Sequence, residues 1–161
     1  MGQKENIITF FEKIICKVIQ MNLERIMFIR EMLELSQREL ADKLNVSKST
    51  YARWETGEKI IPLSHLIDLC NLSNSSLDYA LGLTNSKEKI KNPLKINYKN
   101  IGSKIKQLRE QKKLTQEEFA KSINTTQSVI SEYENGLSPI QTAFLYNICI
   151  KYEVSADWLI K

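Results

Sequence analysis

The feature that most constrains this chain is an internal repeat. Residues 35–57 read LSQRELADKLNVSKSTYARWETG, and residues 114–136 read LTQEEFAKSINTTQSVISEYENG. The copies align 79 positions apart without a gap, and the same offset relates Cys70 to Cys149. A match at one fixed offset through apolar, polar and turn positions predicts a duplicated domain. The 161 residues are therefore expected to form two small domains.

Each copy carries the signals of two short helices joined by a tight turn. Thr115, with Glu118 three residues later, forms a capping box, and the first copy has Ser and Glu at the equivalent positions. Thr126 offers a cap for the second helix, and Gly136 offers the left-handed residue that ends it. Apolar residues between these signals recur at helical spacing. The pattern predicts a helix-turn-helix unit in each copy.

The whole pattern predicts an all-α chain of two tandem five-helix domains. We expect an N-terminal amphipathic helix over residues 1–21, helix-turn-helix domains over 22–82 and 100–161, and a basic linker over 83–99. The first helix of the second domain is expected to begin near Ile101. The linker combines several lysines with little apolar content, so it is expected to be extended and solvated.

Residues 6–20 carry one wide apolar face, which cannot stay in water. Four of its members are Ile7, Phe11, Ile14 and Val18. The face could pack on its own first domain or serve as a dimerisation arm for a homodimer, and the sequence leaves both interpretations open. Mixed charge on the polar side disfavours a helix lying on a membrane surface.

The net charge of +4 is only a weak argument for a nucleic-acid partner. Residues 1–82 carry ten basic and eleven acidic groups, and residues 101–161 carry eight and seven. Residues 83–100 carry five lysines and one Glu, which accounts for the net charge. Neither folded domain is basic as a whole, so DNA binding must depend on where individual charges lie.

Several classes of function are not expected. The cysteines at positions 16, 70 and 149 have no metal-ligand spacing, and the two equivalent ones are expected to be small buried apolar residues. There is no catalytic triad, acidic pair in an apolar pocket or glycine-rich phosphate loop. We expect no enzyme, cofactor, metal or small-molecule ligand. No stretch has the length of a membrane span and no secretory signal is present, so the expected location is the cytoplasm.

Over residues 23–82 and 101–161 the chain resembles the Cro and lambda-repressor family of helix-turn-helix proteins, also called the Xre type. The resemblance is carried by the pattern (Ser/Thr)-Gln-x-Glu-(Leu/Phe)-Ala, by the short turn, and by Glu-x-Gly after the second helix. The resemblance implies that this second helix reads DNA. An Arg stands 25 residues before that Glu in both copies, as Arg30/Glu55 and Arg109/Glu134. In the family this pair ties helix 1 to the reading helix.

The resemblance implies a sequence-specific, double-stranded DNA-binding transcription regulator, expected to repress by occupying its operator. Gln37 and Gln116 begin helix 2, and by resemblance they grip the DNA backbone and brace the start of the reading helix. The remaining residues expected to bind DNA are Ser47, Lys48, Ser49, Thr50 and Arg53 in the first copy, and Thr126, Gln127, Ser128, Val129 and Glu132 in the second.

The two sets of reading residues differ in chemistry. Lys48 and Arg53 suit guanine or phosphate, whereas Gln127 suits adenine and Val129 could contact a thymine methyl. Glu132 could accept from cytosine but repels phosphate. The second unit is therefore either a more selective and weaker reader or a surface for protein contacts. The alternative function is a protein-interaction adaptor, such as an antitoxin-like or phage accessory protein.

Overall fold

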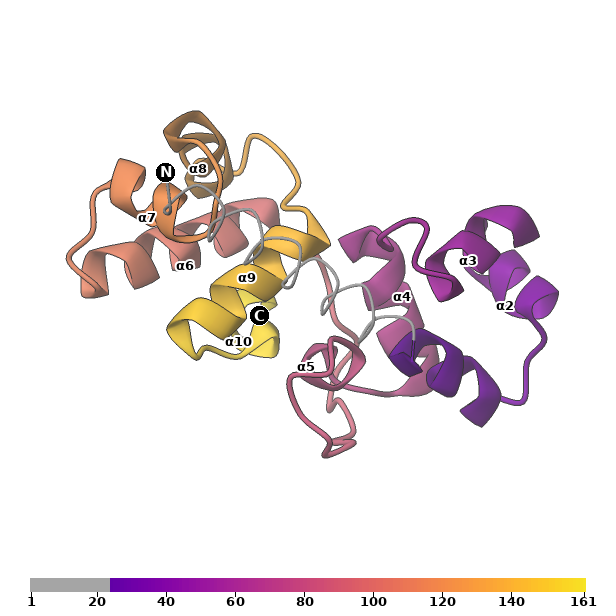
Figure 1. Cartoon of the computed structure of the whole chain (residues 1–161). Coiled ribbons are helices and arrows are strands. Elements are labelled where there is room, and N and C mark those ends of the chain that lie inside the picture. The colour runs from indigo at the N-terminus through magenta and orange to yellow at the C-terminus, as the bar shows by residue number, and fades with distance from the viewer. Residues whose placement is uncertain (1–23) are drawn as a thin grey trace, which may run out of the picture.

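The computed structural model describes residues 24–161, and every regular element in that range is a helix (Figure 1). In the first domain, residues 24–32 are helical and precede α2 (Gln37–Lys43), α3 (Lys48–Glu55), α4 (Leu63–Ser73) and α5 (Leu77–Ala80). The second domain contains α6 (Tyr98–Gln111), α7 (Gln116–Ser122), α8 (Gln127–Glu134), α9 (Thr142–Tyr152) and α10 (Ala156–Ile160). The predicted all-α, tandem architecture is confirmed. The helix predicted over residues 1–21 lies outside the described residues, and the domain boundaries stay predictions.

Side-chain caps explain where the short helices begin. The predicted capping boxes are present at α2 and α7. The hydroxyls of Ser36 and Thr115 accept from backbone N–H groups three residues later, and their own backbone N–H groups donate to the glutamate side chains. The hydroxyl of Thr126 accepts from Val129 N–H and caps α8, as predicted. The α6 helix starts at Tyr98, three residues before the expected Ile101, because the Asn97 side chain caps it.

Two glycines allow the second domain to pack closely. Gly136 ends α8 with a φ of 64°, and a Cβ there would lie 2.9 Å from the backbone of Lys99. At Gly102 a Cβ would lie 2.1 Å from the carbonyl oxygen of Tyr133, so α6 and α8 cross with no room for a side chain. Gly57 has a φ of 72° at the equivalent turn of the first domain, which fits the predicted left-handed helix ends.

The two cores are built from equivalent positions. Buried pairs related by the 79-residue offset include Ile26/Ile105, Leu40/Phe119, Ala41/Ala120, Trp54/Tyr133, Leu66/Leu145 and Cys70/Cys149. Small alanines stand where α2 meets α3 and α7 meets α8, which lets each pair of helices approach closely. The two cysteine thiols are buried, and burial raises the pKa of each well above its ordinary value. They are packing groups, as the sequence predicted.

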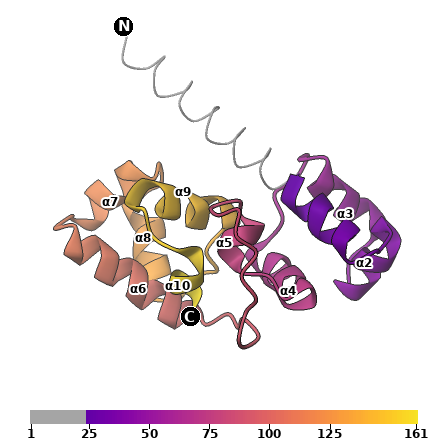
Figure 2. The same cartoon turned by 90° about the horizontal axis from the view of Figure 1, so that it is seen from below.

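The two domains lie side by side, with α5 and α10 meeting between them (Figures 1 and 2). The connecting segment is partly fixed, because the Asn71 side chain bonds the backbone N–H of Leu94 at 2.7 Å and its carbonyl at 3.0 Å. The Leu94 side chain is buried. The expectation of a wholly solvated linker is therefore wrong at this residue, because one isolated leucine gives no periodic signal.

Candidate nucleic-acid interface

An ion-pair network ties α3, the first of the two helices that are expected to read DNA, to the helix at residues 24–32. Arg30 Nε–H donates to Glu55 Oε1 at 2.6 Å, and Gln37 Nε2–H donates to Glu55 Oε2 at 2.7 Å. Tyr51 O–H also donates to Glu55, at 2.8 Å. Burial by itself raises the pKa of Glu55, but the hydrogen bonds from Arg30, Gln37 and Tyr51 outweigh it and hold that pKa below its ordinary value.

The second domain repeats this network with one donor fewer. Arg109 Nε–H donates to Glu134 Oε1 at 2.6 Å, and Gln116 Nε2–H donates to Glu134 Oε2 at 2.8 Å. The position of Tyr51 is taken by Ile130, which is buried and has no hydroxyl. The expectation that an Arg/Glu pair ties helix 1 to the reading helix is confirmed in both domains.

The carboxamide of Gln116 also contacts the reading helix α8 directly. Its Nε2–H donates to Glu134, and its Oε1 accepts from Gln127 Nε2–H at 2.7 Å. Gln127 is thereby oriented at the first position of α8. The expected bracing of the start of the reading helix is confirmed for Gln116, whereas Gln37 bonds Glu55 and so braces the end of α3 rather than its start. The expected grip of both glutamines on phosphate stays a prediction.

The first reading face begins with a cluster of hydroxyls. Ser47 Oγ accepts from Thr50 N–H at 3.1 Å and lies 2.9 Å from the hydroxyls of both Ser49 and Thr50. Each hydroxyl can donate once and accept twice, so the cluster retains capacity for an outside partner. Lys48 is exposed beside it. The predicted residues Ser47, Lys48, Ser49 and Thr50 therefore form one polar surface at the start of α3.

Arg53 lies one turn further along α3 and is paired with Glu58, an interaction that the sequence interpretation missed. Its Nη2 lies 2.5 Å from Glu58 Oε1, and the two side chains are 42% and 58% exposed. Ion pairs this exposed contribute about 0–1 kcal/mol. An ion pair this weak would not prevent Arg53 from turning to a base edge or a phosphate, as the sequence predicts for it. The acidic residue just past the predicted helix end was the available signal.

The second reading face carries a different set of side chains. Thr126, Gln127, Ser128 and Glu132 are all exposed. Val129 is only partly exposed, because it packs against the apolar core. Glu132 stands at the position of Arg53, so the two faces have opposite charge there. These residues form one surface along α8, as predicted, with Val129 at its buried edge.

The lysines that could compensate for Glu132 do not all lie free on the surface. Lys104 Nζ donates to the carbonyl of Trp158 at 2.6 Å and lies 5.5 Å from the centre of its ring. Arg25 makes the equivalent contact over the Tyr79 ring at 4.4 Å. These cations fasten the first helix of each domain to its last helix. Lys106, Lys112 and Lys113 are exposed.

Two other kinds of site are not found within residues 24–161. No group of His, Cys, Asp and Glu side chains in this range is arranged to hold a metal ion. None of the helices in this range is both long enough and apolar enough to cross a membrane.

Comparison with known proteins matches both halves of the chain to the helix-turn-helix family, over residues 26–79 and 105–159. A relative from Bacillus subtilis (strain 168), named as the uncharacterized HTH-type transcriptional regulator YobD, is 38% identical over 64 residues. That alignment covers 40% of this chain and 57% of the relative. No solved structure matches.

A second relative carries a different functional name. Antitoxin PezA from Streptococcus pneumoniae serotype 4 (strain ATCC BAA-334 / TIGR4) is 44% identical over 55 residues. That alignment covers 34% of this chain and 35% of the relative. The chain thus spans about half of one relative's length and about a third of the other's.

Proposed function

Because this chain belongs to the Xre/Cro-type helix-turn-helix family, in two tandem copies, we propose that it is a sequence-specific double-stranded DNA-binding regulator. It represses transcription in the cytoplasm by occupying an operator that overlaps a promoter. This role uses binding alone, without catalysis or a cofactor. The observation that carries the proposal is that two helices with exposed polar faces, α3 and α8, are each fixed by a partly buried Arg/Glu pair.

The reading residues divide the work between the two helices. In α3, Lys48 and Arg53 contact guanine or phosphate, while Ser47, Ser49 and Thr50 offer hydroxyls to base edges or backbone. In α8, the carboxamide of Gln127 pairs with adenine, with Ser128 beside it. Gln37 and Gln116 contact the backbone. Since the two faces differ, a single chain prefers two unlike half-sites to a palindrome.

Salt titration on duplex DNA tests this function. Random-sequence duplex is titrated at several salt concentrations, and affinity should fall steeply because Lys and Arg release counterions from the phosphates. A protein making about 6–10 phosphate contacts loses about 10³–10⁵ in affinity between about 50 and 200 mM salt. Lys48→Ala should reduce the slope, whereas Lys151→Ala, on the exposed side of α9, should leave it unchanged. Almost no binding at the lowest salt would refute the DNA-binding function.

A second candidate function is a protein-interaction adaptor, favoured by one observation. Glu132 is exposed in the middle of α8, where it repels phosphate. The similarity to a protein named as an antitoxin points in the same direction. In that case α8 binds a protein partner and only α3 reads DNA. The Glu132→Gln variant distinguishes the two: it should strengthen DNA binding if α8 lies against phosphates, and should leave DNA binding unchanged if α8 binds protein.

A further inference from the structure

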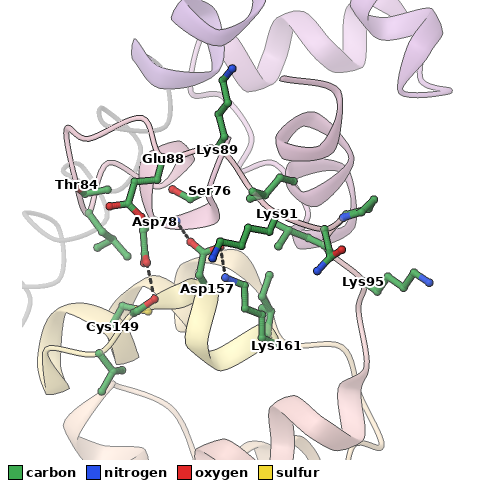
Figure 3. Close-up of a pocket in the computed structure, with 18 of the residues that line it drawn as sticks. Ser76, Asp78, Thr84, Glu88, Lys89, Lys91, Lys95, Cys149, Asp157 and Lys161 are labelled. Carbon is green, nitrogen blue, oxygen red and sulfur yellow. Dashed lines mark hydrogen bonds and ion pairs between the residues drawn. The ribbon is translucent and has the colours of Figure 1, made fainter. Parts of the chain in front are cut away.

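The two domains meet through equivalent residues of the repeat, at a contact that we name the joint. Asp78 Oδ1 accepts from Ala156 N–H at 2.6 Å, and Asp78 Oδ2 accepts from the Ser155 hydroxyl at 2.5 Å. In return, Asp157 Oδ2 accepts from Asp78 N–H at 2.9 Å. Asp78 and Asp157 are equivalent in the repeat, and each accepts a hydrogen bond from the first turn of the other's helix. Figure 3 shows the two aspartates close together.

A second contact between the domains again joins equivalent segments of the repeat. Residues 60–64 and 139–143, which are equivalent in the repeat, face each other across a small apolar cavity of about 380 Å³. The Thr142 hydroxyl donates to the carbonyl of Ile61 at 2.7 Å, and both residues are buried. Ile61 and Ile140, an equivalent pair, line the same cavity.

Contacts of this kind identify the relation between the domains. When residue i meets residue j and j meets i, two copies are related by a twofold axis, as in a symmetric dimer. Here the copies are two halves of one chain, so the axis is approximate and passes between α5 and α10. Figures 1 and 2 show α3 and α8 at opposite ends of the molecule, with α5 and α10 between them.

We infer that one chain acts as a built-in dimer, whose joint holds α3 and α8 at one fixed spacing and in inverted orientation. The inference rests on the proposed function and deepens it, because it specifies the partner DNA. That DNA carries two unlike half-sites arranged as an inverted pair, since operator symmetry mirrors protein symmetry. A freely flexible linker would instead tolerate direct repeats and several spacings.

The joint is partly buried: Asp78 is partly buried and Ser155 is exposed, while Asp157 is buried. Asp157 is 6% exposed, and its capping oxygen is held by the backbone of α5. The N–H groups and the dipole at a helix N-terminus favour a carboxylate there, but at Asp78 the cost of burial is larger and raises the pKa of this carboxyl. Separating the domains would leave the first turns of both helices without these caps. The segment between the domains adds a further restraint at Leu94, which Asn71 holds.

The test begins with duplexes selected from a random library by the full-length protein. Two series are then made from the selected operator: one inverts a half-site to give a direct repeat, and one inserts about 5 base pairs, half a turn, between the half-sites. Each change should lower affinity by about 10²-fold or more, because only one of the two domains can then bind its half-site. Equal affinity for direct and inverted repeats, or for all spacings, would overturn the inference.

The double variant Asp78→Ala/Asp157→Ala removes the caps of the joint and should tolerate the altered duplexes, at the expense of affinity for the selected one. Asp68→Ala, an exposed aspartate of α4, is the matched control and should behave as the parent. Small-angle scattering without DNA gives an independent readout: the double variant should have a larger radius of gyration than the parent. Identical scattering of parent and double variant would contradict the joint.

These readouts separate the two claims. A parent that binds no duplex at any salt concentration refutes the proposed function, and the half-site inference with it, whatever the scattering shows. A parent that binds strongly but ignores spacing and orientation refutes only the inference.

Discussion

Replacing the glutamate of each Arg/Glu pair should destabilise the two domains unequally. In Glu55→Ala the guanidinium of Arg30, which is 15% exposed, loses its partner, and so do Gln37 and Tyr51. Breaking a buried ion pair costs about 3–5 kcal/mol. Since Arg30 retains some access to water, the lower end, about 3 kcal/mol, applies to the ion pair.

The hydroxyl of Tyr51 separates the two domains in this experiment. An unsatisfied buried donor costs about 1–3 kcal/mol, so Glu55→Ala should lower the unfolding free energy of domain 1 by about 4 kcal/mol in total. Glu134→Ala leaves Arg109 and Gln116 without their acceptor, but it affects no tyrosine, because Ile130 occupies the position equivalent to Tyr51. It should lower the stability of domain 2 by about 3 kcal/mol.

The chain provides one fluorescent reporter per domain for the assay. Its two tryptophans are Trp54, buried in domain 1, and Trp158, in α10 of domain 2. Urea titrations of single-tryptophan variants, with the other replaced by Phe, follow each domain separately. Glu58→Ala, at an exposed residue, is the control and should change little. Titrations in which both glutamate variants unfold like the parent, or in which domain 2 is the more affected, would refute this reasoning.

Three further predictions concern other parts of the molecule. Gly102→Ala should destabilise domain 2 by about 1–3 kcal/mol, because its Cβ would overlap the carbonyl of Tyr133; an unchanged urea midpoint at Trp158 would contradict this. Burial raises the pKa of Asp78 above its ordinary 3.8, and the nearby Asp157 carboxylate adds to this effect. The free energy of unfolding should therefore be higher below pH 3.8 and fall as the pH rises through the raised pKa, because the folded state holds the Asp78 proton more tightly than the unfolded state does. Asp78→Asn should lack this decline in urea titrations at a series of pH values, and a decline identical to the parent's would argue against it. If the apolar face that includes Ile7, Phe11, Ile14 and Val18 is a dimer interface, removing residues 1–20 should leave a folded monomer, as measured by sedimentation. A full-length chain that sediments as a monomer, or a truncated chain that unfolds, would instead favour packing of this face on domain 1.

The sequence was informative wherever structure is local or repeated. Capping boxes at Ser36 and Thr115, the turn glycines and the 3.6-residue apolar spacing depend on neighbours a few positions away. The Arg30/Glu55 tie spans 25 residues, but its repetition as Arg109/Glu134 made it visible. The family resemblance then supplied a role that spacing alone could not.

The parts that could not be predicted depend on how separate elements meet. Asp78 and Asp157 each stand in the first turn of a short helix, where acidic residues are common for local reasons, so nothing in the sequence indicates that they cap each other's helices. Leu94 is one apolar residue among lysines, and only Asn71, 23 residues earlier, reveals that it is fixed. The Arg53–Glu58 pair depends on how the chain turns after α3, which composition does not determine.

The central claim is that both helices, α3 and α8, read DNA. The most direct measurement enriches bound duplexes from a random library for the parent, Arg53→Ala and Gln127→Ala. The account predicts a two-part operator in which Arg53→Ala relaxes the preference in one half and Gln127→Ala relaxes it in the other, each by about 1–3 kcal/mol. An operator with one contacted half that is insensitive to Gln127→Ala would contradict the claim and leave α3 as the only reader.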